Sequence, residues 1–525
     1  MVDHFKKHLY WVSLFFAAIY FMLIINLFCL HLKKRHLFFF FDISLPNSIH
    51  QASAQRGLIL DRHGTIIAMN VPFMSAFINP TFLEKPTETM NFLAAYFPDA
   101  YDRLSTHQHK QFMYVGRRLT TEQHALILSA GLSDIKLVEQ MGRYYPFQVT
   151  STVVGITGFD NEGLCGIEYQ EEQLLRSSDN KKNVGKNIQL TIDAQLQFLV
   201  QEELENCIAT FKAKEGSVII MDPDTGDILA LVNVPSFDPN NMTDVHPSLL
   251  NNKAVSDSYE PGSVMKIFAA LAALEEGMVT LDEMIDCKNS KTALIDGRMV
   301  NTWRSEGIIP FLQVIAYSNN IGSALVAKRL GTNLYDHYMR VGFGKKTGID
   351  FPGEHPGFVN PPELWSKQSI YSLSYGYEIL VTPLQLASAF SLLARGGSWI
   401  TPRLIQTSHH DNHENGEQLY KPATIAAIHK ILEYTTTRHT ARPAQLAGFT
   451  LKGKTGSANM LDETKTYKPG KNIFTYAGIV EKDAYKRVIV VRIKETERTD
   501  LFASMVATPL FDRIAGVMVI NDRAW

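Results

Sequence analysis

The fold class follows from residues 216–234, which read GSVIIMDPDTGDILALVNV. Two apolar, β-rich runs flank a polar DPDTGD segment, and this order predicts a strand–turn–strand hairpin. Near the C-terminus, 474–480 and 487–493 form a second pair of such runs. Helical patterns lie between the hairpins, so we expect an antiparallel sheet packed by helices, an α+β fold. After the second hairpin we predict a closing helix with Thr508 as N-cap and Pro509 at its first position.

Upstream of the first hairpin, the sequence indicates a separate domain. Residues 56–68 read as two short strands around an Asp-Arg-His-Gly turn. The polar stretch 176–183 is the best candidate for a linker. Asp193, shortly after it, is a candidate cap for the helix that follows. We therefore predict a non-catalytic N-terminal domain at 42–185 and a second domain at 186–525.

An apolar run near the N-terminus predicts a membrane span. Residues 9–32 contain no acidic or strongly basic residue, and as a helix they would extend about 36 Å, enough to cross a core of about 30 Å. The alternative is a cleaved signal peptide, but the run is too long and lacks a small-residue cleavage site at its end. We expect residues 1–41 to form a cytoplasmic tail and one uncleaved transmembrane helix. Lys6 and Lys7 flank one end and Lys33, Lys34 and Arg35 the other, so the positive-inside rule mildly opposes a cytoplasmic N-terminus. Long domains translocate largely regardless of such charges, so the rule does not decide the orientation.

The overall composition excludes several classes of protein. Lys+Arg 51 and Asp+Glu 53 give a net charge of −2, so nucleic acid is not an expected partner. The cysteines have no C-x-x-C spacing, which supports neither a zinc site nor a disulfide framework, although one disulfide stays open. They are Cys29, Cys165, Cys207 and Cys287. His409, His410 and His413 lie close together, but in a polar stretch that favours a solvated loop over a metal site.

Residues 259–266, YEPGSVMK, contain the first element of a candidate active site. Pro261-Gly262 breaks the chain, and apolar residues at helical spacing follow, which places Ser263 at a helix N-terminus. The helix dipole and the free N–H groups there favour developing negative charge. Lys266 lies one turn further on, so its amine can reach the Ser263 hydroxyl. A neutral lysine can be the base for a serine nucleophile if burial and nearby cations lower its pKa.

Two further motifs follow in order. Residues 318–320 read SNN and residues 454–457 read KTGS. Ser–x–x–Lys, Ser–x–Asn and Lys–Thr–Gly in this order are the signature of penicillin-recognising serine enzymes. Chance matches exist: 178–181, SDNK, lies in the polar linker, and a second KTG at 346–348 precedes a turn-rich stretch. We assign the catalytic role to Lys454, which stands before the strand pair.

Acyl-transfer chemistry assigns a role to each residue. The backbone N–H groups of Ser263 and Ser457 are the natural donors for the oxyanion. Lys454 supplies positive charge for a substrate carboxylate and helps to keep the base neutral. Ser318 can relay the proton to the leaving amine, and Asn320 can hold a peptide amide. The catalytic set is Ser263, Lys266, Ser318, Asn320 and Lys454, with Thr455, Gly456 and Ser457 for substrate binding and with no metal or cofactor.

At these motifs the chain resembles the class B penicillin-binding proteins over nearly its whole length. Further landmarks are 56–68, 143–146, 163–168, 225–230 and 381–387, and SYGY at 374–377 is similar to the division-specific members. The resemblance implies an N-terminal pedestal, a transpeptidase domain, D-Ala-D-Ala stem peptides as donors and inhibition by β-lactams. It also implies septal cell-wall synthesis from the inner membrane, with a periplasmic catalytic domain. No glycosyltransferase domain fits upstream, so we expect a polytopic lipid II polymerase and other division proteins as partners.

Two residues depart from the family pattern, and two rival functions stay open. Ser457 stands where Thr is usual, and Glu378 follows the Tyr-Gly-Tyr run where Gly is usual. A D,D-carboxypeptidase or β-lactamase would share the three motifs but transfer the acyl group to water. A non-catalytic penicillin-binding scaffold is the other alternative, against which the intact set of motif residues argues.

Overall fold

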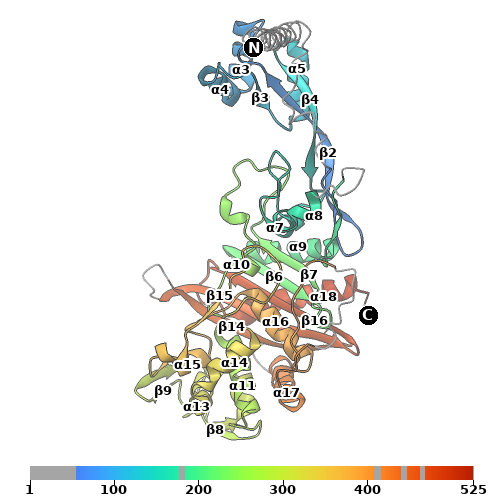
Figure 1. The fold of residues 1–525 in the computed structure, drawn as a ribbon. Helices are drawn as coiled ribbons and strands as arrows, with labels where there is room; N and C mark the ends of the chain where they lie inside the picture. Colours follow the sequence, from blue (N-terminus) through green and yellow to red (C-terminus); the bar gives the residue numbers. More distant parts are fainter. Residues whose placement is uncertain (1–54, 177–183, 407–415, 439–445, 462–466, 524–525) are drawn as a thin grey trace, which may run out of the picture. The chain divides into compact units, whose positions relative to one another are not determined.

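The computed structural model describes residues 55–176, 184–406, 416–438, 446–461 and 467–523 (Figure 1). Residues 55–525 form one compact unit. The predicted span at 9–32, the SDNK match in the linker and the three neighbouring histidines all lie outside the described residues.

A five-stranded antiparallel sheet forms the centre of the catalytic half, in the order β14-β15-β16-β6-β7 (Figure 1). Its strands are β6 (Glu215–Met221), β7 (Ile228–Val234), β14 (Thr450–Leu461), β15 (Tyr467–Lys482) and β16 (Tyr485–Lys494). Both predicted hairpins are therefore confirmed, and the pairing of β16 with β6 joins them into one sheet. This arrangement leaves β14 at the edge.

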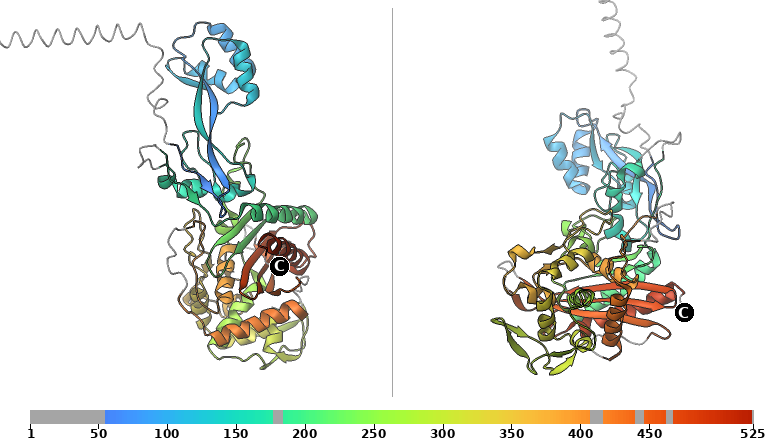
Figure 2. Two further views of the ribbon diagram at one scale, coloured as in Figure 1. Left: turned by 90° about the vertical axis from the view of Figure 1, so that its right-hand side faces the viewer. Right: turned by 60° about the horizontal axis from the view of Figure 1, so that its bottom comes forward.

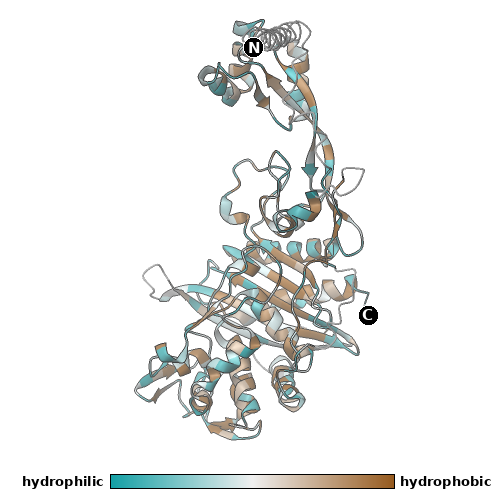
Figure 3. Ribbon diagram, viewed as in Figure 1, coloured by the Kyte–Doolittle hydropathy of each residue, from teal (hydrophilic) through white to brown (hydrophobic). Residues whose placement is uncertain are grey.

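Helices cover both faces of the sheet, which confirms the α+β class. On one face, α9 (Ala194–Phe211) packs beside α18 (Ala503–Asn521) (Figure 2). On the other face lie α11 (Lys266–Glu275) and α16 (Pro383–Ala394). Alternate residues of β6 enter the two cores, because successive side chains of a strand point to opposite faces. Val218 and Ile220 belong to the first core, and Ile219 and Met221 to the second. Figure 3 shows the apolar character of these central strands.

Further elements of the C-terminal half lie between β7 and β14 in the sequence. They are α10 (Lys253–Ser256), η3 (Gly262–Met265), β8 (Met284–Asp286), β9 (Thr292–Ile295), β10 (Arg298–Asn301), β11 (Ile308–Pro310), α12 (Phe311–Ala316), α13 (Asn320–Leu330), α14 (Asn333–Val341), β12 (Phe358–Val359), α15 (Ser369–Ser374), β13 (Ile379–Leu380) and α17 (Pro422–Arg438).

The N-terminal region has its own five-stranded sheet. Its strands are β1 (Ile59–Leu60), β2 (Ile66–Ile78), β3 (Met113–Gly116), β4 (Lys136–Tyr144) and β5 (Ile188–Gln189). The long strand β2 pairs with β1, β3 and β4, and β5 pairs with β1. Helices of this region are α3 (Pro86–Tyr96), α4 (Pro98–Thr106), α5 (Thr121–Ala130), α6 (Ser151–Val154), α7 (Gly166–Gln170) and α8 (Glu172–Arg176). The two strands predicted within 56–68 are confirmed as β1 and the start of β2, which pair antiparallel.

A buried ion cluster holds the predicted landmarks of the N-terminal region together. Arg143 Nε donates to Glu168 Oε1 at 2.6 Å, and Arg56 Nε donates to the other oxygen of the same carboxylate. All three side chains are almost fully buried. Charges can be buried only when they are paired and hydrogen-bonded in this way, so the cluster fixes three distant segments of the chain to one another.

The start of the closing helix was predicted wrongly. The helix α18 begins at Ala503, and Pro509 lies inside it rather than at its first position. Thr508 and Pro509 have the residue types of a helix start, but the apolar face already includes the buried residues Val506 and Ala507. The Ala503 N–H also has an acceptor in Ser457 Oγ, at 3.0 Å. Burial and this distant acceptor start the helix at Ala503, six residues before Pro509.

Among the described residues, α18 is also the one helix long and apolar enough to cross a bilayer. Of its most apolar stretch, 56% is buried within the structure, in the core that α18 shares with α9. The helix is therefore a core element here, and the anchor predicted at 9–32 stays a prediction.

Candidate active site

The three sequence motifs meet around two lysine amines. Lys266 Nζ lies 3.1 Å from Ser263 Oγ, 3.0 Å from Ser318 Oγ and 2.6 Å from the Ser318 carbonyl oxygen. Lys454 Nζ lies 3.2 Å from Ser318 Oγ and 3.0 Å from the Thr455 carbonyl oxygen. Ser318 Oγ is thus within hydrogen-bond distance of both amines, and a continuous polar chain runs from Ser263 to Lys454.

Glycines allow the nucleophile segment to lie directly against the edge strand. Ser263 lies in the 3₁₀ turn η3, which leads into α11. Gly262 has φ +59°, and a Cβ there would stand 2.7 Å from the Ser457 carbonyl oxygen. A Cβ on Gly456 would stand 2.2 Å from the Pro261 carbonyl oxygen. Both distances are shorter than any real Cβ contact, so these positions exclude side chains.

We expect Gly456→Ala to lower the rate of acylation by a penicillin about a hundredfold, because the two backbones must separate and a small misplacement of the nucleophile is costly. Gly516→Ala is the matched control, since a Cβ at this position of α18 meets nothing within 4 Å. Stopped-flow acylation by a fluorescent penicillin measures both. Equal rates for the two variants would show that the close approach at Gly456 is unimportant.

Ser318 is held in an uncommon backbone conformation. Its φ is +58°, a left-handed value that costs a non-glycine residue about 1 kcal/mol. This turn ends α12 and lets the next residue, Asn319, cap α13 by accepting from the Gly322 N–H at 2.9 Å. The capping role therefore falls to Asn319, and Ser318 stays available to the two lysines. Asn320 is fixed by donating from Nδ2 to the Asn301 carbonyl oxygen at 2.7 Å.

Both lysines are fully buried, and neither forms an ion pair with a carboxylate of the described residues. Burial lowers the pKa of Lys454 to about 7. Burial, and then the like charge of Lys454, hold the pKa of Lys266 well below its ordinary value. Both shifts favour the neutral amine, and the like charge of Lys454 adds to the effect at Lys266. An anionic ligand group would supply the counter-charge that the described residues do not provide.

The Ser457 end of the KTGS motif is fixed by α18. Ser457 Oγ accepts the Ala503 N–H, which leaves the hydroxyl hydrogen of Ser457 free to donate. A donor beside Lys454 suits a carboxylate. The second KTG is arranged differently: the Thr347 N–H and hydroxyl both donate to Glu354 Oε1, at 2.6 and 2.7 Å, while Lys346 is exposed.

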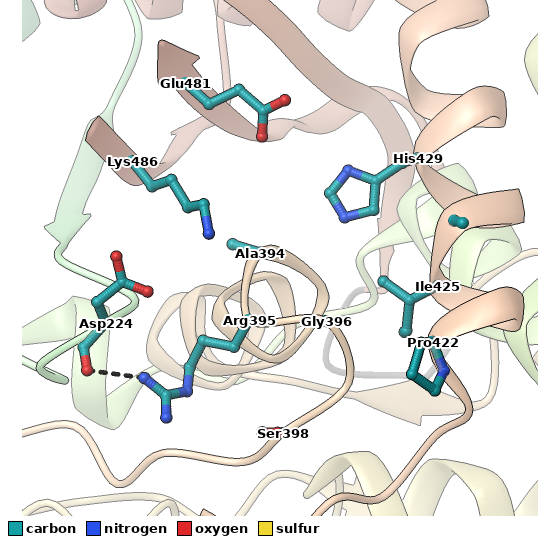
Figure 4. Close-up of a pocket in the computed structure, with 11 residues that line it drawn as sticks. Asp224, Ala394, Arg395, Gly396, Ser398, Pro422, Ile425, His429, Glu481 and Lys486 are labelled. Carbon is teal, nitrogen blue, oxygen red and sulfur yellow. Dashed lines mark hydrogen bonds between the residues drawn. The ribbon is translucent and has the colours of Figure 1, made fainter. Parts of the chain in front are cut away.

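A surface cavity of about 740 Å³ lies elsewhere, between α16, α17 and two hairpin turns (Figure 4). Its ionisable lining residues are Asp224, Arg395, His429, Glu481 and Lys486, and none of the predicted catalytic residues lines it. The described part of the chain holds no cluster of three or more metal-ligating side chains. Among the described residues, Cys165, Cys207 and Cys287 are free, so no two of these three form the disulfide that the sequence left open.

Comparisons with known proteins agree with this geometry. A family model of the penicillin-binding protein transpeptidase domain matches residues 216–516, and one of the penicillin-binding protein dimerisation domain matches 51–197. Peptidoglycan D,D-transpeptidase FtsI of Escherichia coli is 27% identical over 499 residues, which cover 89% of this chain and 84% of that protein. Stage V sporulation protein D of Bacillus subtilis is 29% identical over 502 residues, covering 88% and 77%.

A solved structure shows the same fold. Ligand-free penicillin-binding protein 3 of Mycobacterium tuberculosis matches with a TM-score of 0.68 and 25% identity, over 90% of this chain and 97% of that one. Together with the two family models, this structural match confirms the resemblance to the class B penicillin-binding proteins that the motifs predicted. The chain belongs to the class B penicillin-binding proteins, the family in which a dimerisation-type domain precedes the transpeptidase domain.

Proposed function

We propose that the chain is a serine-type peptidoglycan D,D-transpeptidase and a target of β-lactams. The observation on which this depends is a continuous polar chain, Ser263–Lys266–Ser318–Lys454, in which each side chain lies within hydrogen-bond distance of the next. The donor is a stem peptide that ends in D-Ala-D-Ala. Relatives named peptidoglycan D,D-transpeptidase support the same reaction.

The geometry supports a division of roles in acylation. Neutral Lys266 accepts the hydroxyl proton of Ser263 as Oγ attacks the carbonyl carbon of the penultimate D-Ala. Backbone N–H groups of Ser263 and Ser457 are the proposed donors to the oxyanion. Lys454 and the Ser457 hydroxyl bind the terminal carboxylate, and its negative charge stabilises the Lys454 ammonium.

Collapse of the tetrahedral intermediate needs a proton on the leaving amine. Ser318 Oγ touches both lysines, so it can pass a proton from Lys266 to the nitrogen of the departing D-Ala. The amine of a second stem peptide then attacks the acyl-enzyme carbonyl. Lys266 accepts a proton from this amine and returns it to Ser263 Oγ as the bond between the acyl carbon and Oγ breaks. Asn320, fixed by its bond to the Asn301 carbonyl, is placed to hold a peptide amide of the substrate.

The cellular setting remains a proposal. The N-terminal span would hold the chain in the inner membrane with the catalytic domain in the periplasm. A role in septal wall synthesis, with a polytopic lipid II polymerase and other division proteins as partners, follows from family membership and from relatives such as FtsI.

Intact-mass analysis after exposure to benzylpenicillin tests the proposal. We expect one covalent adduct that persists for hours on the unsubstituted chain and is absent from Ser263→Ala, because the nucleophilic hydroxyl is lost. Ser248→Ala, at an exposed serine of the same half, is the control and should form the adduct.

Each contrary outcome would support a different conclusion about the function or the nucleophile. Release of the adduct within minutes would indicate a β-lactamase-type hydrolase. No adduct on the unsubstituted chain would indicate a non-catalytic scaffold. An adduct that persists on Ser263→Ala would show that another residue is the nucleophile.

A further inference from the structure

The surface cavity between α16 and α17 is separate from the acyl-transfer site, since none of the predicted catalytic residues lines it (Figure 4). Its volume of about 740 Å³ is typical of sites for small organic ligands, which span about 300–1,000 Å³. The groups on its walls indicate which class of ligand it can bind.

The guanidinium of Arg395 presents an edge that no described residue contacts. Arg395 Nη1 donates to the carbonyl oxygens of Pro223 and Asp224, at 3.1 and 2.7 Å, and these bonds fix the group at the end of α16. Among the described residues, neither Nε nor Nη2 has a hydrogen-bond partner, and Nε is buried. Nε and Nη2 form the edge of a guanidinium that binds a carboxylate through two parallel hydrogen bonds. The fold therefore presents two oriented donors for an anionic group.

A second cation, Lys486, lies on the same side of the cavity as Arg395 (Figure 4). Its amine forms no ion pair with a carboxylate of the described residues. Of the two carboxylates that line the cavity, Glu481 is paired with Lys452, whereas Asp224 has no cation partner in the described part of the chain. Two cations therefore stand against one uncompensated carboxylate, and this excess of positive charge favours an anionic ligand.

The opposite wall is uncharged and partly apolar. Pro422 and Ile425 of α17 lie on this side together with His429 (Figure 4). His429 Nε2 is 2.9 Å from the Leu393 carbonyl oxygen, and Nδ1 is 2.9 Å from Lys452 Nζ. Because an ammonium can only donate, Nδ1 is the acceptor and Nε2–H the donor, which describes a neutral ring. Burial lowers the pKa of His429 in agreement with this state. The wall can therefore accommodate the apolar body of an organic anion.

The cavity also adjoins the groups that fix the strand of the KTGS motif. Lys452 lies on β14 two residues before Lys454, so both side chains point to the same face of the strand. Its amine is bonded to Glu481 and His429, which both line the cavity. A ligand in the cavity therefore lies next to the residues that hold β14, without contacting the catalytic side chains.

We propose that this cavity is a binding site for an organic carboxylate. The carboxylate binds to Nε and Nη2 of Arg395, Lys486 supplies further positive charge, and the apolar body of the ligand lies against Pro422 and Ile425. The inference goes beyond the proposed function, because these residues take no part in acyl transfer.

Binding of 4-fluorobenzoate to the full chain, followed by the fluorine NMR signal of the probe, tests the site. The matched probe is 4-fluorobenzamide, which has the same ring and nearly the same size but no charge. We expect the carboxylate to bind about tenfold more tightly than the amide, because charge-assisted hydrogen bonds to a guanidinium are stronger than neutral ones. Inorganic phosphate lacks an apolar body and should displace the probe less readily than unlabelled benzoate does.

Two substitutions assign the binding to this cavity. Lys486→Gln should weaken the binding of 4-fluorobenzoate about threefold, the value of one partly exposed charge pair, and should leave the fold intact because the amine has no described partner. Arg395→Lys keeps the charge but loses the edge with two donors, so it should weaken binding about fivefold. Lys430→Gln removes the same charge from an exposed site on α17 outside the lining and should bind the probe as the unsubstituted chain does.

Several results would overturn the proposal. One is absence of binding, and others are equal affinity for the carboxylate and the amide or equal displacement by phosphate and benzoate. Unchanged affinity in either Lys486→Gln or Arg395→Lys would place the probe elsewhere, and an equal loss in Lys430→Gln would show that overall charge explains the effect. None of these measurements uses the acylation of Ser263, so their outcome is independent of the proposed function.

Discussion

Lys266→Arg is expected to react with benzylpenicillin about a thousandfold more slowly than the unsubstituted chain, nearly as slowly as Lys266→Ala. Arginine keeps the positive charge but cannot be deprotonated. The amine of Lys266 is 3.1 Å from Ser263 Oγ and fully buried, so no other described base can take its place without rearrangement. Stopped-flow acylation measures the three rates.

The pH dependence gives an independent check of the same role. The reactive form of Lys266 is the neutral amine, so the acylation rate should rise with pH and level off once Lys266 is deprotonated. Burial and Lys454 hold its pKa well below the ordinary value. The plateau should therefore begin well below the free-lysine pKa of about 10.4. A near-normal rate for Lys266→Arg would instead make Lys266 an electrostatic orienter, with the proton leaving through Ser318.

Lys454→Ala should lower the acylation rate at least a hundredfold, because it removes the charge beside the oxyanion and the partner of Ser318. The duplicate motif supplies the control. Lys346 is exposed, and its motif neighbour Thr347 is bonded to Glu354, so Lys346→Ala should stay close to the unsubstituted rate. The opposite pattern would mean that the wrong KTG was assigned.

Local signals in the sequence predicted much of the fold. The hairpins were recognisable because β6 and β16 are continuous β-rich runs bounded by turns, and Asp193 was recognisable as the cap of α9, where it accepts from the Leu196 N–H. The start of α18 was missed because its first N–H is satisfied by Ser457, 46 residues earlier in the chain. No local pattern reports such an acceptor.

The candidate site also combines features that local sequence signals indicate with features that depend on contacts between distant residues. Ser263, Lys266 and Lys454, which the structure brings together, could be singled out because the spacing and order of their motifs can be read directly from the chain. The bond between Glu378 and Glu260 joins residues 118 apart in sequence, and the left-handed turn at Ser318 depends on how α12 meets α13. Both features could be recognised only in the folded structure, although the sequence already showed Glu378 as a departure from the family pattern.

Burial of Lys266 and Lys454, for which the described residues supply no carboxylate partner, also makes the folding equilibrium depend on pH. In the unfolded chain both amines titrate near 10.4, whereas Lys454 in the folded chain titrates at about 7 and Lys266 well below its ordinary value. Between about pH 7 and 10.4 the unfolded state therefore binds more protons than the folded state, and the free energy of unfolding rises with pH in this window. Towards lower pH these two residues oppose folding, since both charges must then be held in the same buried space. An anionic ligand that binds there stabilises the whole domain as well as the site.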